Sequence, residues 1–187
     1  VINEGAYGLT FPSGPQVFEI APTEKVPCWV RLTVRGRPGH GSVPHNDNCA
    51  EHLVQALDRV TRWQREVRLN PVMRDHVEAM ARAGGLKVPP EAGVATLASL
   101  SPSLRARMSN TVTVTTISTG IKVNVIPAEA TATLDCRLLP DVDVDGFLSE
   151  LRSVIADDRV QVEAINRFVG AESSMDTRFV EVVRDVI

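Results

Sequence analysis

Two stretches of alternating apolar and polar residues constrain the fold of this chain more than any other feature. The first is VPCWVRLTVRG at 26–36, and the second is ATATLDCRLL at 130–139. Successive side chains of a β-strand point to opposite faces, so a period of two places all apolar residues on one side. Each stretch therefore predicts a half-buried strand.

Two amphipathic helices are predicted as well. Asn46 or Asp47 can cap the first helix, which would run to about Gln64, and Asp143 can cap the second. Two further strands are predicted at 110–118, before a turn at Gly120, and at 159–165. The apolar faces of the two helices would consist of Ala50, Leu53, Val54, Leu57 and Val60, and of Phe147, Leu148, Leu151, Val154 and Ile155.

The resulting order is strand, helix, strand, strand, helix, strand, which is the ferredoxin-like split β-α-β arrangement. We therefore predict an α+β fold over residues 26–165, a four-stranded antiparallel sheet with both helices on one face. Residues 69–109 interrupt this order and are interpreted as a partly helical insertion, with Pro71 in a first helical turn. Segments 1–25 and 166–187 do not fit the domain and are predicted to belong to a larger structure.

Composition argues against several classes of partner. With 20 basic and 23 acidic residues and a net charge of −3, the chain has no basic stripe for nucleic acid. No apolar run approaches the roughly 20 residues of a membrane span, and the first residues do not resemble a signal peptide.

The chain has three cysteines, Cys28, Cys49 and Cys136. They are odd in number and far apart, so we expect no disulfide framework and a reducing, cytoplasmic location.

The segment RGRPGHGSVPH at 35–45 places two glycines and two prolines around His40. These residues restrict the loop that follows the first strand, and they would hold the imidazole in an exposed position. A surface histidine that only caps a turn is the simpler alternative. A metal site formed by His40, His45 and Cys49 lacks a fourth ligand, and a thiol hydrolase using Cys49 and His52 lacks an orienting acid.

Asn124 and Arg137 lie thirteen positions apart, in the segments NVIP and DCR. Arg137 is expected to point away from the apolar face of its strand. A guanidinium in that position can bind a carboxylate through two parallel hydrogen bonds. Alternatively, Arg137 forms only a salt bridge, with Asp135 or Glu129.

Three segments together resemble one family: INEGA at 2–6, GRPGHGSVPHNDNCAEHL at 36–53, and GIKVNVIPAEATATLDCRLLP at 120–140. This is the zinc metallopeptidase family of aminoacylases, glutamate carboxypeptidases, dipeptidases and acetylornithine or succinyl-diaminopimelate deacylases. The resemblance implies a two-zinc catalytic domain with a ferredoxin-like lid domain inserted into it. The lid domain would form the homodimer. Residues 1–25 and 166–187 would then be parts of the catalytic domain.

The resemblance also implies roles for single residues. His40 would reach into the active site of the partner subunit and donate a hydrogen bond to the scissile carbonyl oxygen as it gains charge. Asn124 and Arg137 would bind the backbone and the free carboxylate of a peptide or an acylated amino acid. Asn3 stands where most members carry a zinc-binding aspartate, and a neutral carboxamide is a poorer ligand. Asn3 is thus a candidate metal ligand, although it could equally cap a turn.

The implied function is zinc-dependent hydrolysis of an amide bond in a substrate with a free carboxylate. Most of the metal ligands would lie outside this sequence, so we expect the chain alone to bind no zinc and to be inactive. The alternative is a non-catalytic ferredoxin-like module that dimerises or binds a small ligand.

Overall fold

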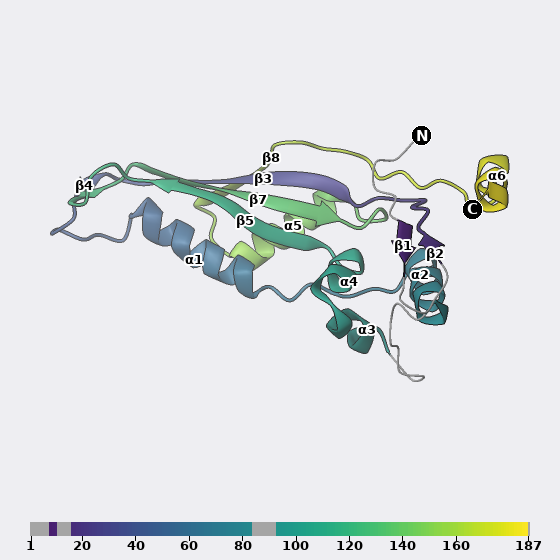
Figure 1. The fold of residues 1–187 in the computed structure, drawn as a ribbon. Coiled ribbons are helices and arrows are strands. Elements are labelled where there is room, and N and C mark those ends of the chain that lie inside the picture. Colours follow the sequence, from purple (N-terminus) through teal and green to yellow (C-terminus); the bar gives the residue numbers. More distant parts are fainter. Residues whose placement is uncertain (1–7, 11–15, 84–92, 187) are drawn as a thin grey trace. The chain divides into compact units, whose positions relative to one another are not determined.

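The computed structural model describes residues 8–10, 16–83 and 93–186 (Figure 1). The chain divides into two compact units, which are treated separately below. We call Val26–Arg65 with Asn110–Val169 the sheet unit. The flanking unit consists of Val1–Lys25, Glu66–Ser109 and Gly170–Ile187.

The sheet unit is built on a four-stranded sheet with the strand order β5-β7-β3-β8. Its strands are β3 (Val26–Arg35), β5 (Thr111–Thr119), β7 (Glu129–Leu138) and β8 (Val160–Ala164). Every neighbouring pair is antiparallel. This is the predicted α+β arrangement, with the first strand between the third and the fourth, and the fold class is confirmed.

Helices α1 (Cys49–Arg62) and α5 (Val144–Ile155) lie on the same side of this sheet (Figure 1). The alternating apolar residues of β3 and β7 face them, because their side chains are buried while the intervening residues are not. Trp63 stacks on Phe147 between the two helices, with the ring centroids 5.9 Å apart. The most completely buried members of this core are Cys28, Val30, Leu32, Val34, Cys49, Ala56, Ala130, Cys136, Leu138 and Leu151.

The start of α1 differs from the sequence prediction. Asn48, not Asn46 or Asp47, caps the helix, and its side-chain oxygen accepts a hydrogen bond from the Ala50 N–H. Asp47 is engaged elsewhere, because both its backbone and its side-chain oxygen accept hydrogen bonds from the Arg37 N–H. For α5 the prediction is confirmed, with Asp143 as the N-cap residue.

Two short strands that the sequence pattern did not indicate lie next to the main sheet. β4 (Gly39–His40) and β6 (Val125–Ile126) form an antiparallel pair with Gly39 opposite Ile126 and His40 opposite Val125. Strands of two residues are too short to show a period in the sequence. They nevertheless bring the His40 loop against the segment that contains Asn124.

The flanking unit contains the helices of the region that the sequence predicted to be partly helical. α2 begins at Pro71 as expected, with Asn70 as its cap. Val77, Leu97, Ala98, Leu104 and Met108 form a small separate core. The elements of this unit are β1 (Gly8–Thr10), β2 (Gln16–Phe18), α2 (Pro71–Arg82), α3 (Val94–Leu100), α4 (Pro102–Arg107) and α6 (Arg178–Val186).

The sequence pattern alone indicates an insertion in the lid at residues 69–109. In the structure Glu66–Ser109 belongs to the flanking unit, together with Val1–Lys25 and Gly170–Ile187. The Lys25 ammonium group donates hydrogen bonds to the backbone oxygens of Ala106 and Ser109, at 2.9 and 2.8 Å. The Ser173 N–H donates to the Pro22 oxygen at 2.7 Å. No helix in the described part of the chain is long and apolar enough to cross a membrane.

Candidate functional site

His40 lies at an exposed position on β4, and its ring is held from one side only. The Ser42 N–H donates a hydrogen bond to His40 Nδ1 at 3.2 Å, and the Ser42 hydroxyl oxygen lies 2.8 Å from the same nitrogen. The Val43 N–H donates to the His40 backbone oxygen at 2.9 Å and closes a tight turn. Among the described residues, none hydrogen-bonds to the other ring nitrogen, Nε2. The turn thus presents one nitrogen of the imidazole to the outside.

Asn124 lies beside this turn. Its backbone oxygen accepts a hydrogen bond from the Gly41 N–H at 2.8 Å, which extends the β4–β6 pairing by one step. The Asn124 side chain is exposed. The structure therefore brings together two of the predicted site residues, although they are far apart in the sequence.

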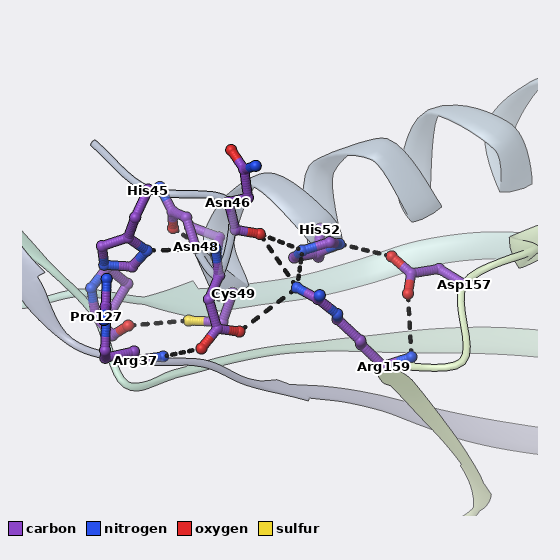
Figure 2. Close-up of polar contacts among 11 residues, drawn as sticks. Arg37, His45, Asn46, Asn48, Cys49, His52, Pro127, Asp157 and Arg159 are labelled. Carbon is purple, nitrogen blue, oxygen red and sulfur yellow. Dashed lines mark hydrogen bonds and ion pairs between the residues drawn. The ribbon is translucent and has the colours of Figure 1, made fainter.

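The base of the His40 loop is fixed by close packing of backbone. A Cβ atom on Gly36 would lie 2.5 Å from the Asp47 backbone oxygen and 3.0 Å from the Cys49 nitrogen, so only glycine fits. The Gly36 N–H donates to the Ala128 oxygen at 3.0 Å. The Cys49 thiol donates to the Pro127 oxygen at 3.2 Å (Figure 2). The loop is thereby connected to α1 and to the segment before β7.

A second set of polar contacts holds the chain after the loop (Figure 2). His52 Nδ1 lies 2.7 Å from an Asp157 carboxylate oxygen, and Arg159 Nη1 lies 2.8 Å from His52 Nε2. Arg159 also donates to the Asn46 backbone oxygen at 3.1 Å. Burial alone would raise the pKa of Asp157, but the Arg159 backbone N–H and the His52 ring outweigh it and lower this pKa. These contacts connect the start of α1 to the turn between α5 and β8.

These contacts leave no support for the thiol hydrolase that the sequence left open. Both nitrogens of His52 have other partners, and the Cys49 thiol faces Pro127. Burial raises the pKa of Cys49, which disfavours the nucleophilic thiolate.

A metal site formed by His40, His45 and Cys49 is not supported either. His45 Nδ1 accepts a hydrogen bond from the Asp47 N–H at 3.3 Å, and its buried Nε2 has no hydrogen-bond partner among the described residues. No group of three or more His, Cys, Asp or Glu side chains in the described ranges is arranged to hold a metal ion. The described residues therefore do not fit a zinc site by themselves. Asn3 lies outside the described residues.

Arg137 lies on the face of the sheet opposite the helices, and its side chain is about half exposed. Its Nε and Nη2 donate to the two carboxylate oxygens of Asp135 at 2.8 and 3.2 Å. Of the two salt-bridge partners considered from the sequence, Asp135 is therefore the one used. Glu129 instead binds Arg35, at 3.0 Å.

Arg137 and His40 lie at opposite ends of the sheet unit. β7 begins at Glu129, next to the hydrogen bond between Gly36 and Ala128, and Arg137 is near its other end, opposite Thr111. Eight residues of strand separate the two ends, a distance of about 26 Å at 3.3 Å per residue. One copy of the chain therefore cannot place both side chains on one small substrate.

Cys28 and Cys136 face each other in the core, directly opposite in the pairing of β3 with β7. Both are buried free thiols. Burial raises the pKa of both, that of Cys136 to about 12. Neither thiol is suited to catalysis.

Residues 23–163 match the family model of the M20 peptidase dimerisation domain. Human aminoacylase-1 is 29% identical over 151 residues, which cover 78% of this chain and 29% of the relative. The N-fatty-acyl-amino acid synthase/hydrolase PM20D1 of Xenopus tropicalis is 31% identical over 165 residues, with 80% and 31% covered. The chain thus spans about three tenths of the length of these curated relatives.

Solved structures agree on the fold. The M20 family metallo-carboxypeptidase Sso-CP2 of Sulfolobus solfataricus superposes with a TM-score of 0.60 at 18% identity, covering 88% of this chain and 48% of that one. The di-peptidase Dug1p of Saccharomyces cerevisiae gives a TM-score of 0.55 at 13% identity, with 83% and 38% covered. Since the family model covers most of its length, the chain belongs to the M20 peptidase dimerisation-domain family.

Proposed function

We propose that this dimerisation domain is part of a longer hydrolase that cleaves an amide bond in a peptide or an N-acyl amino acid with a free carboxylate. The names of the curated relatives, aminoacylase-1 and N-fatty-acyl-amino acid synthase/hydrolase, support this class of substrate. Zinc belongs to the proposal only for the longer protein, because the described residues provide no group of three metal ligands. The free buried thiols support a reducing compartment such as the cytoplasm.

The proposed dimer surface is the edge strand β5 together with α1. In the described sheet β5 pairs only with β7, and its sequence TVTVTTIST has neither charge nor proline. Such an edge is prone to pair with another strand. Ile117 lies opposite the buried Ala132 and so points to the helix-covered face, yet it is 60% exposed. Val54 on α1 is 64% exposed, so apolar surface lies on both elements at this edge.

The observation that carries the proposal is the separation of His40 from Arg137 within one subunit. Pairing of the β5 edge with its copy in a second subunit would explain this separation. β5 runs from Thr111, beside Arg137, to Thr119, at the end of the sheet that holds His40. In a twofold dimer the same surface meets itself, so the β5 strands would pair antiparallel. The end of one subunit that carries His40 and Asn124 would then lie near Arg137 of the partner subunit.

Each substrate would thus be bound by two subunits. His40 would donate from Nε2 to the carbonyl oxygen as negative charge develops, with Asn124 beside it as a further amide donor. Arg137 of the partner subunit would bind the substrate carboxylate. Asp135 accepts two of the five N–H groups of this guanidinium, and it leaves three for a ligand.

A hybrid dimer of the longer protein tests this arrangement. His40→Ala and Arg137→Ala are prepared as separate homodimers, and each is expected to lose about 100-fold in kcat/KM. A hybrid with one subunit of each kind has one site with both residues intact. We therefore expect it to regain about half of the wild-type activity, measured after purification through two different affinity tags.

A hybrid that is no more active than its parents would show that the two residues do not act across the dimer. Unchanged turnover in the His40→Ala homodimer would exclude the role of His40 altogether.

A non-catalytic module remains the second candidate for the chain by itself, because the described residues form no metal site. Two measurements together separate the two cases: light scattering after size-exclusion chromatography, with and without zinc, and an activity assay of the longer protein. If the domain is only a non-catalytic module, it should dimerise without metal, and the longer protein should show no turnover.

A further inference from the structure

We propose that Ser42 is a positioning residue that holds His40 in the tautomer with its proton on Nε2. This inference rests on the proposed function in one respect only, namely that His40 acts as a hydrogen-bond donor. The tautomer itself is a property of the loop and can be measured without turnover.

The geometry of the turn determines which ring nitrogen carries the proton. The Ser42 backbone N–H can only donate, and it points at His40 Nδ1 from 3.2 Å. The Ser42 hydroxyl oxygen lies 2.8 Å from the same nitrogen and can donate a second hydrogen bond. A proton on Nδ1 would place two N–H groups face to face. The neutral ring therefore carries its proton on Nε2.

The backbone holds Ser42 in this position. The Val43 N–H bonds to the His40 oxygen at 2.9 Å and closes the turn over Ser42, while the Gly41 N–H is bound by Asn124 at 2.8 Å. Within the described part of the chain, the Ser42 hydroxyl has no hydrogen-bond partner other than His40. Among the described residues, the contact with His40 Nδ1 is thus the one hydrogen bond that the Ser42 hydroxyl makes.

The chemical consequence is a donor that is already oriented. A neutral imidazole with its proton on Nε2 and its Nδ1 occupied can donate only from Nε2. If the ring exchanged between tautomers, part of the population would present a lone pair to the substrate oxygen and would repel the developing charge. Ser42 removes that population.

The first test reads the tautomer directly in the chain labelled with 15N-histidine. The chain has four histidines, so the ring signals are few, and the His40→Ala variant assigns those of His40. We expect the shifts of a ring protonated on Nε2 in the wild type. Ser42→Ala removes the hydroxyl contact at 2.8 Å and leaves only the longer backbone N–H bond at 3.2 Å on His40 Nδ1. The shifts should therefore move part of the way toward a mixture of tautomers, and Ser42→Thr, which keeps the hydroxyl, should restore them.

Ser153→Ala is the matched control, because among the described residues the Ser153 hydroxyl bonds to the Ser149 backbone oxygen on α5 and to no part of the His40 loop. This variant should leave the His40 signals unchanged. Unchanged ring shifts in Ser42→Ala would show that the backbone N–H alone sets the tautomer, and they would overturn the positioning role of the Ser42 side chain.

The second test is turnover in the longer protein. Ser42→Ala should lower kcat about three- to tenfold, the effect of one hydrogen bond, and should leave KM unchanged. Ser42→Thr should recover most of this loss. Full turnover in Ser42→Ala, combined with a large loss in His40→Ala, would overturn the inference while the proposed function stands. Full turnover in His40→Ala would overturn the role of His40 in the proposed function, and the ring shifts would still decide the tautomer.

Discussion

Cys136 illustrates how burial changes the chemistry of a single residue. Its thiol lies in the core opposite Cys28, where a charged thiolate would have no solvent around it. Burial therefore raises the pKa of Cys136 from its ordinary value of 9.0 to about 12. The same residue type in an exposed loop would be reactive at mild alkaline pH, whereas here it is part of the packing.

This pKa predicts a loss of stability at alkaline pH. Below pH 9 the thiol is protonated in both states, and its contribution to the stability of the folded state is complete. Between pH 9 and about 12 the unfolded chain releases the proton while the folded chain keeps it, so stability decreases by up to about 4 kcal/mol. Urea midpoints at pH 8 and pH 11 measure the loss.

Cys136→Ala provides the control for this measurement. The variant lacks the thiol, so its stability should depend less on pH across the same interval, although its baseline stability will be lower. An identical decrease in both proteins would show that Cys136 does not cause it.

Gly36 is a second residue whose identity the packing determines. A methyl group there would overlap with the Asp47 backbone oxygen, which cannot move without the start of α1. We expect Gly36→Ala to destabilise the sheet unit by about 1–3 kcal/mol in urea unfolding. Gly93→Ala is the comparison, since a Cβ atom at Gly93 would meet nothing within 4 Å. Equal effects of the two substitutions would contradict the packing argument.

At the level of elements, the two edges of the sheet differ. β5 is nine residues long and carries no charge, whereas β8 has five residues and includes Glu163. Charged side chains on an edge strand oppose strand pairing. By this criterion β5 is the edge more prone to strand pairing, and it is the edge proposed above for the dimer.

A lysine in each edge strand tests this difference. Ile117→Lys should convert a dimer into a monomer, because it places a charge in the proposed apolar contact. Gln161→Lys introduces the same side chain at an exposed position on β8 and should leave the dimer intact. Analytical ultracentrifugation gives the masses. A dimer that survives Ile117→Lys and dissociates with Gln161→Lys would assign the interface to the other edge.

Helices and strands also differ in how well the sequence predicted them. β3 and β7 each keep a period of two over ten residues, and α5 begins at the predicted Asp143, because local patterns determine these features. The cap of α1 was predicted at Asn46 or Asp47, one or two positions before the observed cap Asn48. Asn46, Asp47 and Asn48 are all suitable caps, and only the contact of Asp47 with Arg37 shows which of them is available.

At the scale of the whole molecule, the chain folds as two units whose segments alternate along the sequence. Residues 66–109 leave the sheet unit after α1 and return to it before β5, and they pack with the segments before 26 and after 169. Hydropathy patterns describe each segment separately and contain no information on which segments share a core. The proposed composite site also exists only at this scale, since it requires two copies of the sheet unit, and the hybrid dimer is its test.

The sequence by itself determined the strand and helix order, the buried faces of β3 and β7, and the chemical types of the candidate residues. These follow from local rules, because the period and the caps are encoded within about ten neighbouring residues. Only the tertiary structure decided that His40 lies beside Asn124 and far from Arg137, and that Ser42 holds the His40 ring. Such relations depend on hydrogen bonds and strand register between distant segments, which a linear pattern does not record.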